Sequence, residues 1–321
     1  MKILANDGLS KEGIDALQHA GFKVITEGVS QDQLIAFINQ NDIEVLLVRS
    51  ATKVRQDVFD QCPGLKFVGR GGVGMDNIDV AYGRSKGVLV MNTPGASSIS
   101  VAELVIGHCF SLARFLHQSN RYMPTQGVSE FKSLKKKYEA GIELRGKTLG
   151  IVGMGRIGQA TAAYALGCGM KVVYVDRSKS EVAIPIQIAH LDPISVTLQA
   201  SSLDDVLASS DFLTLHIPAQ ANGQAVIGQA ELGKMKKGSF LINTARGGSV
   251  DEEALKVALR NGHLGGAALD VFVNEPTPDA ELMTIDALAL TPHIGAATAE
   301  AQDRVGLEMA SIIIEHLSIK A

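Results

Sequence analysis

The hydrophobic residues of this chain fall into short apolar runs that alternate with amphipathic, helix-compatible segments. In the first part of the chain the runs predict strands at residues 2–5, 22–26, 45–48, 65–68 and 88–91. Helices are expected over 10–20, where Ser10 can cap the first turn and Gly21 ends it, and over 30–39. Short, continuously apolar strands that alternate with helices are typical of a parallel sheet covered on both faces. We therefore expect a doubly wound, flavodoxin-like α/β domain here.

A second series with the same alternation begins near residue 148. Its apolar runs predict strands at 148–152, 171–175, 211–215, 238–243, 266–270 and 288–290. Helices are expected at 159–166, 203–208 and 252–261. The stretch from Asp176 to Ser202 carries Pro185 and Pro193 and is expected to be irregular. The second series predicts a second doubly wound parallel sheet.

The segment between the two series contains one strongly apolar helix. Ser100 and Glu103 form a capping-box pattern, and the helix they open is apolar almost all round as far as His117. A helix that is apolar on every face is buried on every face, so we expect it between domains or subunits, with His108 and His117 as packing residues. Residues 119–141 break the pattern, and the lysines at 135–137 are interpreted as a solvated face. A last helix, 298–317, has apolar positions spaced for docking.

Composition narrows the class of protein. A chain of 321 residues is expected to form two domains. Its net charge of −4 argues against a general nucleic-acid surface, which needs a basic face. The three cysteines are far apart in sequence and are interpreted as buried thiols in a reducing compartment. No stretch approaches 18 charge-free apolar residues and the N-terminus lacks a signal-peptide core, so we expect a cytoplasmic protein without membrane contact.

The clearest chemical signal is a glycine pattern between a predicted strand and a predicted helix. Gly153, Gly155 and Gly158 follow strand 148–152 in the G-x-G-x-x-G spacing that binds a dinucleotide pyrophosphate. Asp176 ends the next strand, where a carboxylate accepts the adenosine ribose hydroxyls and repels a 2′-phosphate. The pattern therefore favours NAD over NADP. Arg177 keeps NADP as an alternative cofactor, because an arginine beside the acidic position can bind the 2′-phosphate.

Two arginines of the first domain follow strand ends. Arg49 and Arg70 stand beside Ser50 and the glycine-rich turn 71–74. Ligands of open α/β sheets gather beyond the carboxyl ends of the strands, and a guanidinium matches a carboxylate or phosphate in a two-pronged geometry. The alternative is a pair of solvent-facing arginines. We interpret them as part of a pocket for an anionic substrate.

Three polar residues follow strands of the second domain or the return from it. An imidazole such as His293 can take a hydroxyl proton near neutral pH, and a carboxylate such as Glu275 favours its protonated form. Arg246 can hold a substrate carboxylate. Singly, each is equally consistent with a surface or turn residue, and only the combination with a nucleotide fold favours hydride transfer. No His, Cys or Asp cluster has metal-ligand spacing, so no metal is expected.

Together these motifs resemble the D-isomer-specific 2-hydroxyacid dehydrogenases over nearly the whole chain. The segments that carry the resemblance are Gly153–Gly158 with Asp176, Thr244–Gly248, Ala268–Pro276 and Pro292–Ala296. Segments of the first domain are most similar to the members that oxidise D-3-phosphoglycerate, and these are Val48–Thr52, Val68–Asn77 and Asn92–Gly95.

The resemblance implies a role for each matching residue. Arg246 would bind substrate, Glu275 would support the histidine, and His293 would be the acid/base. Asp270 would hold the nicotinamide carboxamide. The other cofactor positions implied are Val73, Gly153, Gly155, Arg156, Ile157, Gly158, Asp176, Ile217, Pro218, Thr244, Gly295 and Ala296. The substrate positions implied are Arg49, Ser50, Arg70, Gly72 and Val73, together with Arg246 and His293.

The resemblance also implies a split organisation. A substrate domain of residues 1–97 and 290–321 would enclose an inserted Rossmann NAD-binding domain of residues 98–289. We expect no C-terminal regulatory domain, and hence no feedback by serine. The implied reaction is NAD-dependent oxidation of D-3-phosphoglycerate to 3-phosphohydroxypyruvate, the entry to serine synthesis, in a homodimer built on helix 100–117, or a tetramer.

Three alternatives remain open on the sequence. The first is a glyoxylate/hydroxypyruvate reductase or another D-2-hydroxyacid dehydrogenase. The second is an NADH-sensing, corepressor-like binding protein on the same fold, and the third is a non-catalytic NAD-binding subunit. A substrate panel separates the first, and NADH binding without turnover would favour the others.

Overall fold

The computed structural model describes residues 1–192, 194–220 and 222–317, and it divides into two compact units. The small unit comprises Met1–Ser98 and the segment from Ala296 onward, and the nucleotide unit comprises Ile99–Gly295. The expected second boundary, before residue 290, therefore moves to a position after Gly295, because Ile294 and Gly295 donate backbone hydrogen bonds to Asp270. Pro193 and residues 318–321, which belong to expected segments, lie outside the described residues.

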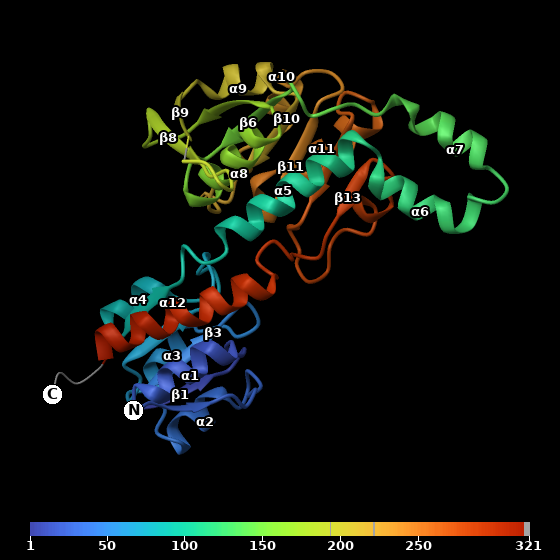
Figure 1. Cartoon of the computed structure of the whole chain (residues 1–321). Helices are drawn as coiled ribbons and strands as arrows, with labels where there is room; N and C mark the ends of the chain where they lie inside the picture. Colours follow the sequence, from blue (N-terminus) through green and yellow to red (C-terminus); the bar gives the residue numbers. More distant parts are fainter. Residues whose placement is uncertain (193, 221, 318–321) are drawn as a thin grey trace. The chain divides into compact units, whose positions relative to one another are not determined.

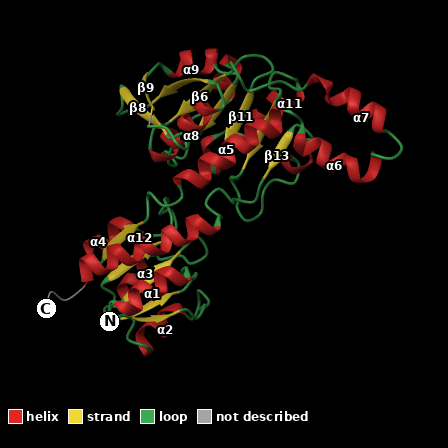
Figure 2. Ribbon diagram, viewed as in Figure 1, coloured by secondary structure: helices red, strands yellow, loops and turns green. Residues whose placement is uncertain are grey.

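The small unit is a five-stranded parallel sheet in the order β2-β1-β3-β4-β5. This is the flavodoxin-like order, so the expected class is confirmed. Its elements are β1 (Lys2–Ala5), α1 (Lys11–His19), β2 (Lys23–Ile25), α2 (Leu34–Gln40), β3 (Val45–Val48), α3 (Gln56–Gln61), β4 (Phe67–Arg70), α4 (Val80–Ser85), β5 (Leu89–Asn92) and α12 (Ala299–Leu317). Figures 1 and 2 show the strands of this unit between helices.

Alternate residues of each strand in the small sheet enter different cores. Ile3 and Val45 pack with Met309 and Ile313 of α12, whereas Leu46 packs with residues of α2 and α3 on the other face. Side chains of a strand point alternately to its two faces, so both faces of this sheet are buried. The near-continuous apolar runs of the sequence follow from that double burial.

Helices α1 and α12 lie side by side in the small unit (Figure 1) and cross at a pair of glycines. A Cβ atom on Gly306 would lie 2.1 Å from Ser10 Oγ, and one on Gly13 would lie 2.7 Å from the Gly306 carbonyl carbon. Ser10 is also the expected N-cap of α1, since its hydroxyl oxygen accepts a hydrogen bond from the Gly13 N–H at 3.3 Å. The helix cap and the crossing therefore share the same few atoms.

The nucleotide unit is a six-stranded parallel sheet in the order β13-β12-β11-β10-β6-β7. Its strands are β6 (Thr148–Val152), β7 (Lys171–Val175), β10 (Phe212–Leu215), β11 (Phe240–Asn243), β12 (Gly266–Leu269) and β13 (Leu288–Leu290). Its helices are α5 (Ser98–Ala113), α6 (Leu116–Gln126), α7 (Phe131–Lys137), α8 (Arg156–Gly167), α9 (Leu203–Ser209), α10 (Gln229–Lys234) and α11 (Glu252–Arg260), with 3-10 turns at Tyr138–Ala140, Gly247–Ser249 and Leu282–Thr284. Leu241 enters one core and Ile242 the other, so this sheet is doubly wound as expected.

The segment after Asp176 differs from the expectation of irregular chain. It forms an antiparallel hairpin of β8 (Glu181–Ile186) and β9 (Ile194–Gln199). Val182 and Leu198 of the hairpin pack on the core beside α8. A single parallel β-bridge joins Tyr174 of β7 to Ala200, which directly follows β9. One-sided burial gives the hairpin alternating apolar positions, but Pro185 and Pro193 led to the expectation of irregular chain.

The apolar helix between the two series also differs from expectation. It begins at Ser98, so Ser100 lies inside it and the proposed capping box is wrong. It ends at Ala113, and α6 follows at an angle of 58° after Phe115, whose φ of +55° breaks the helix. Residues 119–141, which break the apolar pattern, are mostly helical, and Gln118, Arg121 and Tyr122 of α6 are hydrogen-bonded to Asp286, which is remote in sequence.

In the part of the chain that the structure describes, no single helix has the length and apolar character needed to cross a membrane. Only the bent pair α5 and α6 reaches that length and composition jointly.

The three cysteines are free thiols, as expected. Cys62 and Cys109 are buried, and Cys168 is only partly so. Burial raises the pKa of the Cys109 thiol to about 12 and that of Cys62 to about 11, so both stay protonated.

The glycine crossing of α1 and α12 yields a stability prediction. Gly306→Ala places a methyl group where Ser10 Oγ already lies, and we expect overpacking to lower the free energy of unfolding by about 1–3 kcal/mol. Gly233→Ala in α10 is the matched control, because its Cβ meets no atom within 4 Å and alanine is the better helix former. Urea unfolding measures the free energy of unfolding of both variants. An unchanged free energy in Gly306→Ala would contradict the close helix crossing.

Candidate active site

Most of the expected cofactor and catalytic residues lie at one edge of the six-stranded sheet. All six strands are parallel, so the residues that directly follow them meet at the carboxyl edge. Gly153 follows β6, Asp176 follows β7, and Ile217 and Pro218 come just after β10. At the far side Thr244 and Arg246 follow β11, Asp270 follows β12, and His293 lies just beyond β13. Arg49, Ser50, Arg70, Gly72, Val73 and Ala296 belong to the small unit.

The glycine turn after β6 has the geometry that a dinucleotide needs. Gly153 has a φ of +97°, and a Cβ there would lie 2.6 Å from the carbonyl oxygen of His216 and 2.8 Å from Ile217 Cγ2. A Cβ on Gly158 would lie 2.2 Å from the Gly153 carbonyl oxygen. Only at Gly155 is the space open, at the N-terminus of α8, where a pyrophosphate can approach the free N–H groups of Arg156 and Ile157.

Asp176 is held by the backbone around it. Its carboxylate accepts hydrogen bonds from the Met154 N–H at 2.7 Å, the Ser178 N–H at 2.8 Å and the Lys179 N–H at 3.1 Å. Burial alone would raise the pKa of Asp176, but the hydrogen bonds from Ser178, Met154 and Lys179 outweigh it and lower that pKa. The carboxylate is therefore ionised beside the glycine turn. The Arg177 guanidinium donates a hydrogen bond to the Gln220 side-chain oxygen at 2.9 Å.

His293 and Glu275 form a hydrogen-bonded pair. His293 Nδ1 lies 2.7 Å from Glu275 Oε2, and the other oxygen of Glu275 accepts the Phe272 N–H at 2.9 Å. The carboxylate thereby fixes the ring orientation and favours the tautomer with the proton on Nδ1. The His293 side chain is 47% exposed, and Nε2 is the ring nitrogen that Glu275 does not contact. Its backbone has a φ of +54°, which a tight turn must maintain.

Asp270 maintains that turn. Its carboxylate is 1% exposed and accepts the N–H groups of Ile294 at 2.8 Å and Gly295 at 2.9 Å, together with the Thr291 hydroxyl at 2.6 Å. The Thr291 hydroxyl in turn lies 3.3 Å from Nε2 of the buried His108, which is thus a packing residue with a polar partner. A buried carboxylate needs such partners, and here they are the backbone on either side of His293.

Arg246 lies in a loop whose path depends on the next residue, Gly247. A Cβ on Gly247 would lie 2.1 Å from the carbonyl carbon of Phe272, so only glycine allows the Arg246 loop to pack on the loop that carries Glu275. The Asn243 side chain donates to the Arg246 carbonyl at 2.8 Å. The signal in the sequence was the Gly247-Gly248 pair directly after the arginine.

Thr244 precedes this loop, and its hydroxyl is buried without a hydrogen-bond partner among the described residues. A buried, unpaired hydroxyl at the carboxyl edge fits a site that awaits a polar ligand. Together with the open space at Gly155 and the ionised Asp176, this residue set fits a dinucleotide. No cluster of His, Cys, Asp or Glu within the described ranges could hold a metal ion.

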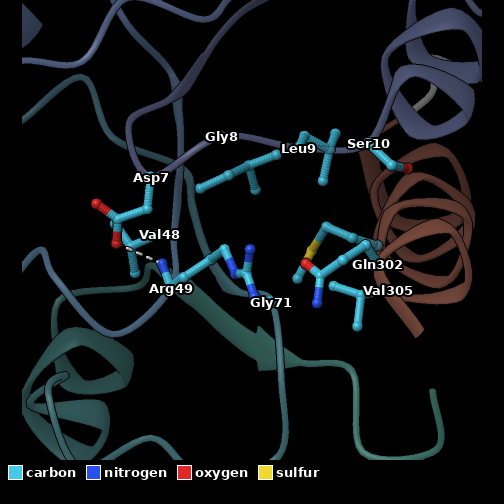
Figure 3. Close-up of a pocket in the computed structure, with 11 residues that line it drawn as sticks. Asp7, Gly8, Leu9, Ser10, Val48, Arg49, Gly71, Gln302 and Val305 are labelled. Carbon is cyan, nitrogen blue, oxygen red and sulfur yellow. Dashed lines mark hydrogen bonds between the residues drawn. The ribbon is translucent and has the colours of Figure 1, made fainter. Parts of the chain in front are cut away.

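The small unit has a cavity of about 270 Å³ at the carboxyl edge of its own sheet. Arg49, Gly71 and Gln302 line it, and Figure 3 shows the Arg49 side chain among these residues. Ser50, the next residue, is exposed. The expected anion-binding arginine therefore lines a cavity of the size of a small metabolite.

Arg70 and the glycine turn form a second part of the same edge. A Cβ on Gly72 would lie 2.6 Å from Arg70 Nη1, so the guanidinium lies directly against the glycine backbone, whose φ is +136°. The Gly72 N–H donates to the Thr93 hydroxyl at 2.8 Å, and the Asn92 amide donates to the Val73 carbonyl at 2.6 Å. Both sides of the turn are thus anchored to the end of β5.

Comparison with known proteins agrees with this geometry. Residues 106–295 match the family model of the D-isomer specific 2-hydroxyacid dehydrogenase NAD binding domain. The chain is 40% identical to a hydroxypyruvate reductase of Thermotoga maritima over 99% of both chains. It is also 40% identical to a D-3-phosphoglycerate dehydrogenase of Methanocaldococcus jannaschii over 98% of this chain, but it spans only 57% of that relative's length.

A solved structure extends the likeness to three dimensions. The apo form of the D-mandelate dehydrogenase of Rhodotorula graminis superimposes with a TM-score of 0.83, at 26% identity, over 98% of this chain and 94% of that one. The family model identifies residues 106–295, which include the six-stranded sheet, as an NAD-binding domain. The chain belongs to the D-isomer-specific 2-hydroxyacid dehydrogenases and is an NAD-dependent oxidoreductase of small molecules.

Proposed function

We propose that this chain oxidises D-3-phosphoglycerate to 3-phosphohydroxypyruvate with NAD as the hydride acceptor. The hydrogen-bonded pair of His293 and Glu275 carries the proposal, because it supplies a half-exposed proton acceptor in an NAD-binding unit. The D-3-phosphoglycerate dehydrogenases among the relatives, about 40% identical, support the choice of substrate.

The chemistry divides between the cofactor and the protein. Bound NAD supplies the site that accepts the hydride from the substrate carbon. His293 Nε2 takes the hydroxyl proton, and Glu275 stabilises the resulting imidazolium through Nδ1. Arg246 holds the substrate carboxylate and polarises the carbonyl that forms. Gly153–Gly158 and Asp176 hold the pyrophosphate and the adenosine ribose.

The substrate assignment depends on the two arginines of the small unit. Arg49 and Arg70 are the cations that we assign to the phosphate of D-3-phosphoglycerate, while Arg246 takes the carboxylate. A guanidinium binds a phosphate in a two-pronged geometry and with charge-assisted hydrogen bonds. The cavity beside Arg49, of about 270 Å³, has room for that group.

A second candidate is reduction of hydroxypyruvate. It is favoured by the Thermotoga maritima relative, which this chain matches over 99% of both lengths, whereas it spans 57% of the Methanocaldococcus jannaschii dehydrogenase. The same residues would run the reaction in reverse, with His293 donating the proton. A panel of D-3-phosphoglycerate, D-glycerate, hydroxypyruvate and glyoxylate separates the two candidates.

The acid/base role of His293 gives the first kinetic prediction. We expect His293→Ala to lower kcat by about 10²- to 10⁴-fold, because a positioned general base contributes that much. The dissociation constant of NADH, measured by fluorescence titration, should stay unchanged. The exposed His19→Ala is the control and should retain full turnover. Persistent turnover of His293→Ala would refute the role.

The phosphate role of Arg49 gives the second kinetic prediction. Loss of charge-assisted hydrogen bonds worth about 1.5–3 kcal/mol should raise KM for D-3-phosphoglycerate by about 10- to 100-fold in Arg49→Ala. KM for D-glycerate, which lacks the phosphate, should change little. Arg55→Ala, which removes a surface arginine paired with Asp79, is the matched control. Equal losses for both substrates would contradict the assignment.

We further propose that the chain forms a homodimer through α5, α6 and α7. In Figures 1 and 2, α6 and α7 extend away from the sheet of the nucleotide unit as an arm. Large apolar side chains are exposed on α5 and along this arm, and these are Ile99, Phe110, Leu116, Met123, Val128 and Phe131. Several large exposed apolar side chains along one arm favour an interaction site there.

The dimer is tested by mass in solution. We expect light scattering after size exclusion to give twice the chain mass for the wild type, and one chain mass for the double variant Val128→Asp with Phe131→Asp. A wild-type monomer would contradict the proposal, and a fourfold mass would indicate a tetramer. Leu191→Asp between β8 and β9, which also replaces an exposed large apolar residue, is the control.

A further inference from the structure

The loop that carries Arg49 is attached to one carboxylate, that of Asp7. Asp7 lies just after β1, the neighbour of β3 in the small sheet. Its Oδ2 accepts the Arg49 N–H at 2.6 Å and the Thr52 N–H at 3.1 Å, and its Oδ1 accepts the Thr52 hydroxyl at 2.5 Å. Figure 3 shows the Asp7 carboxylate beside the Arg49 backbone. Three donors of one four-residue loop thus converge on a single side chain.

The carbonyl groups of the same loop are held by a second side chain. The Asn77 amide donates to the Arg49 carbonyl at 2.8 Å and to the Thr52 carbonyl at 2.6 Å. Both polar groups of the Arg49 backbone are therefore fixed, the N–H by Asp7 and the C=O by Asn77. This leaves the direction of the Arg49 Cα–Cβ bond little freedom.

We propose that Asp7 is a positioning residue that aims the Arg49 guanidinium into the cavity of about 270 Å³. This inference rests on the proposed function, in which Arg49 binds the substrate phosphate. An arginine side chain has about 2 kcal/mol of rotamer entropy, and a fixed backbone lowers the part of it that is lost on binding.

The chemistry of the site explains why an aspartate is needed. Asp7 lines the same cavity as Arg49, where a free carboxylate would repel an anionic substrate. Three hydrogen-bond donors disperse its charge toward the loop instead. In the nearly isosteric Asp7→Asn the NH₂ group would replace either Oδ2, which accepts both the Arg49 and the Thr52 N–H, or Oδ1, which accepts the Thr52 hydroxyl, so part of the network must be lost.

The test compares two substrates in Asp7→Asn and Asp7→Ala. With NAD and D-3-phosphoglycerate we expect KM to rise about 10- to 100-fold, because a misplacement near 1 Å costs that much, while kcat stays within about twofold. KM for D-glycerate and the dissociation constant of NADH should not change. A purely structural role would instead impair both substrates equally.

Two further variants control for stability. Asp60 also holds other residues through its carboxylate, with the Tyr82 hydroxyl between its two oxygens and Lys86 paired to Oδ1, so Asp60→Asn perturbs a comparable set outside the loop and should leave KM unchanged. Thr52→Val removes one donor to Asp7 and keeps the N–H. It should raise KM for D-3-phosphoglycerate in the same direction by less, even if the Asp7 variants fail to fold.

A double-mutant cycle with Arg49→Ala separates this inference from the proposed function. If Asp7 acts through Arg49, its substitution has no further effect on KM in the Arg49→Ala background. Additive effects would overturn the inference and leave the phosphate role of Arg49 intact. If Arg49→Ala impairs both substrates equally and the effects are not additive, the phosphate assignment fails and the positioning role stands. If Arg49→Ala has no effect, both fail.

Discussion

The nucleotide unit depends on one buried carboxylate. Asp270 is almost fully buried, and a charge in that environment is tolerable only when hydrogen-bond donors surround it. The donors are the Thr291 hydroxyl and the N–H groups of Ile294 and Gly295, so the requirement to satisfy Asp270 forces the turn that presents His293. His293, the proposed acid/base, is thus positioned by a buried carboxylate at the end of the neighbouring strand β12.

The same device recurs at other strand ends. The Asp176 carboxylate accepts hydrogen bonds from the N–H groups of Met154, Ser178 and Lys179. The Asp7 carboxylate accepts hydrogen bonds from the N–H groups of Arg49 and Thr52. In each case a carboxylate at the carboxyl edge accepts several bonds from a loop that bears a functional group. Loops have few packing contacts of their own, and an ionised acceptor gives them a fixed shape with strong, charge-assisted hydrogen bonds.

Glycines provide the complementary constraint, because they let loops approach one another closely. Gly247 allows the Arg246 loop to lie on the Phe272 backbone, and Gly153 allows the turn after β6 to lie on His216. Gly155 differs, since its open side faces no protein atom within 4 Å and is free for the cofactor. A glycine in this chain therefore marks either contact between loops or space for a ligand, and only the structure separates the two.

The sequence by itself determined the two doubly wound sheets, the order of their strands along the chain, and the identity of the dinucleotide turn. It could do so because double burial leaves continuous apolar runs, and because Gly153, Gly155 and Gly158 are adjacent in the chain. It missed the β8–β9 hairpin, which packs on the core beside α8, and helices α6 and α7, which are bonded to Asp286, a residue distant in sequence. It also assigned no role to Asp7, Gly247 and Asn77. Their contributions are hydrogen bonds and close approaches between loops that follow different strands, and the parallel sheet alone brings those loops together.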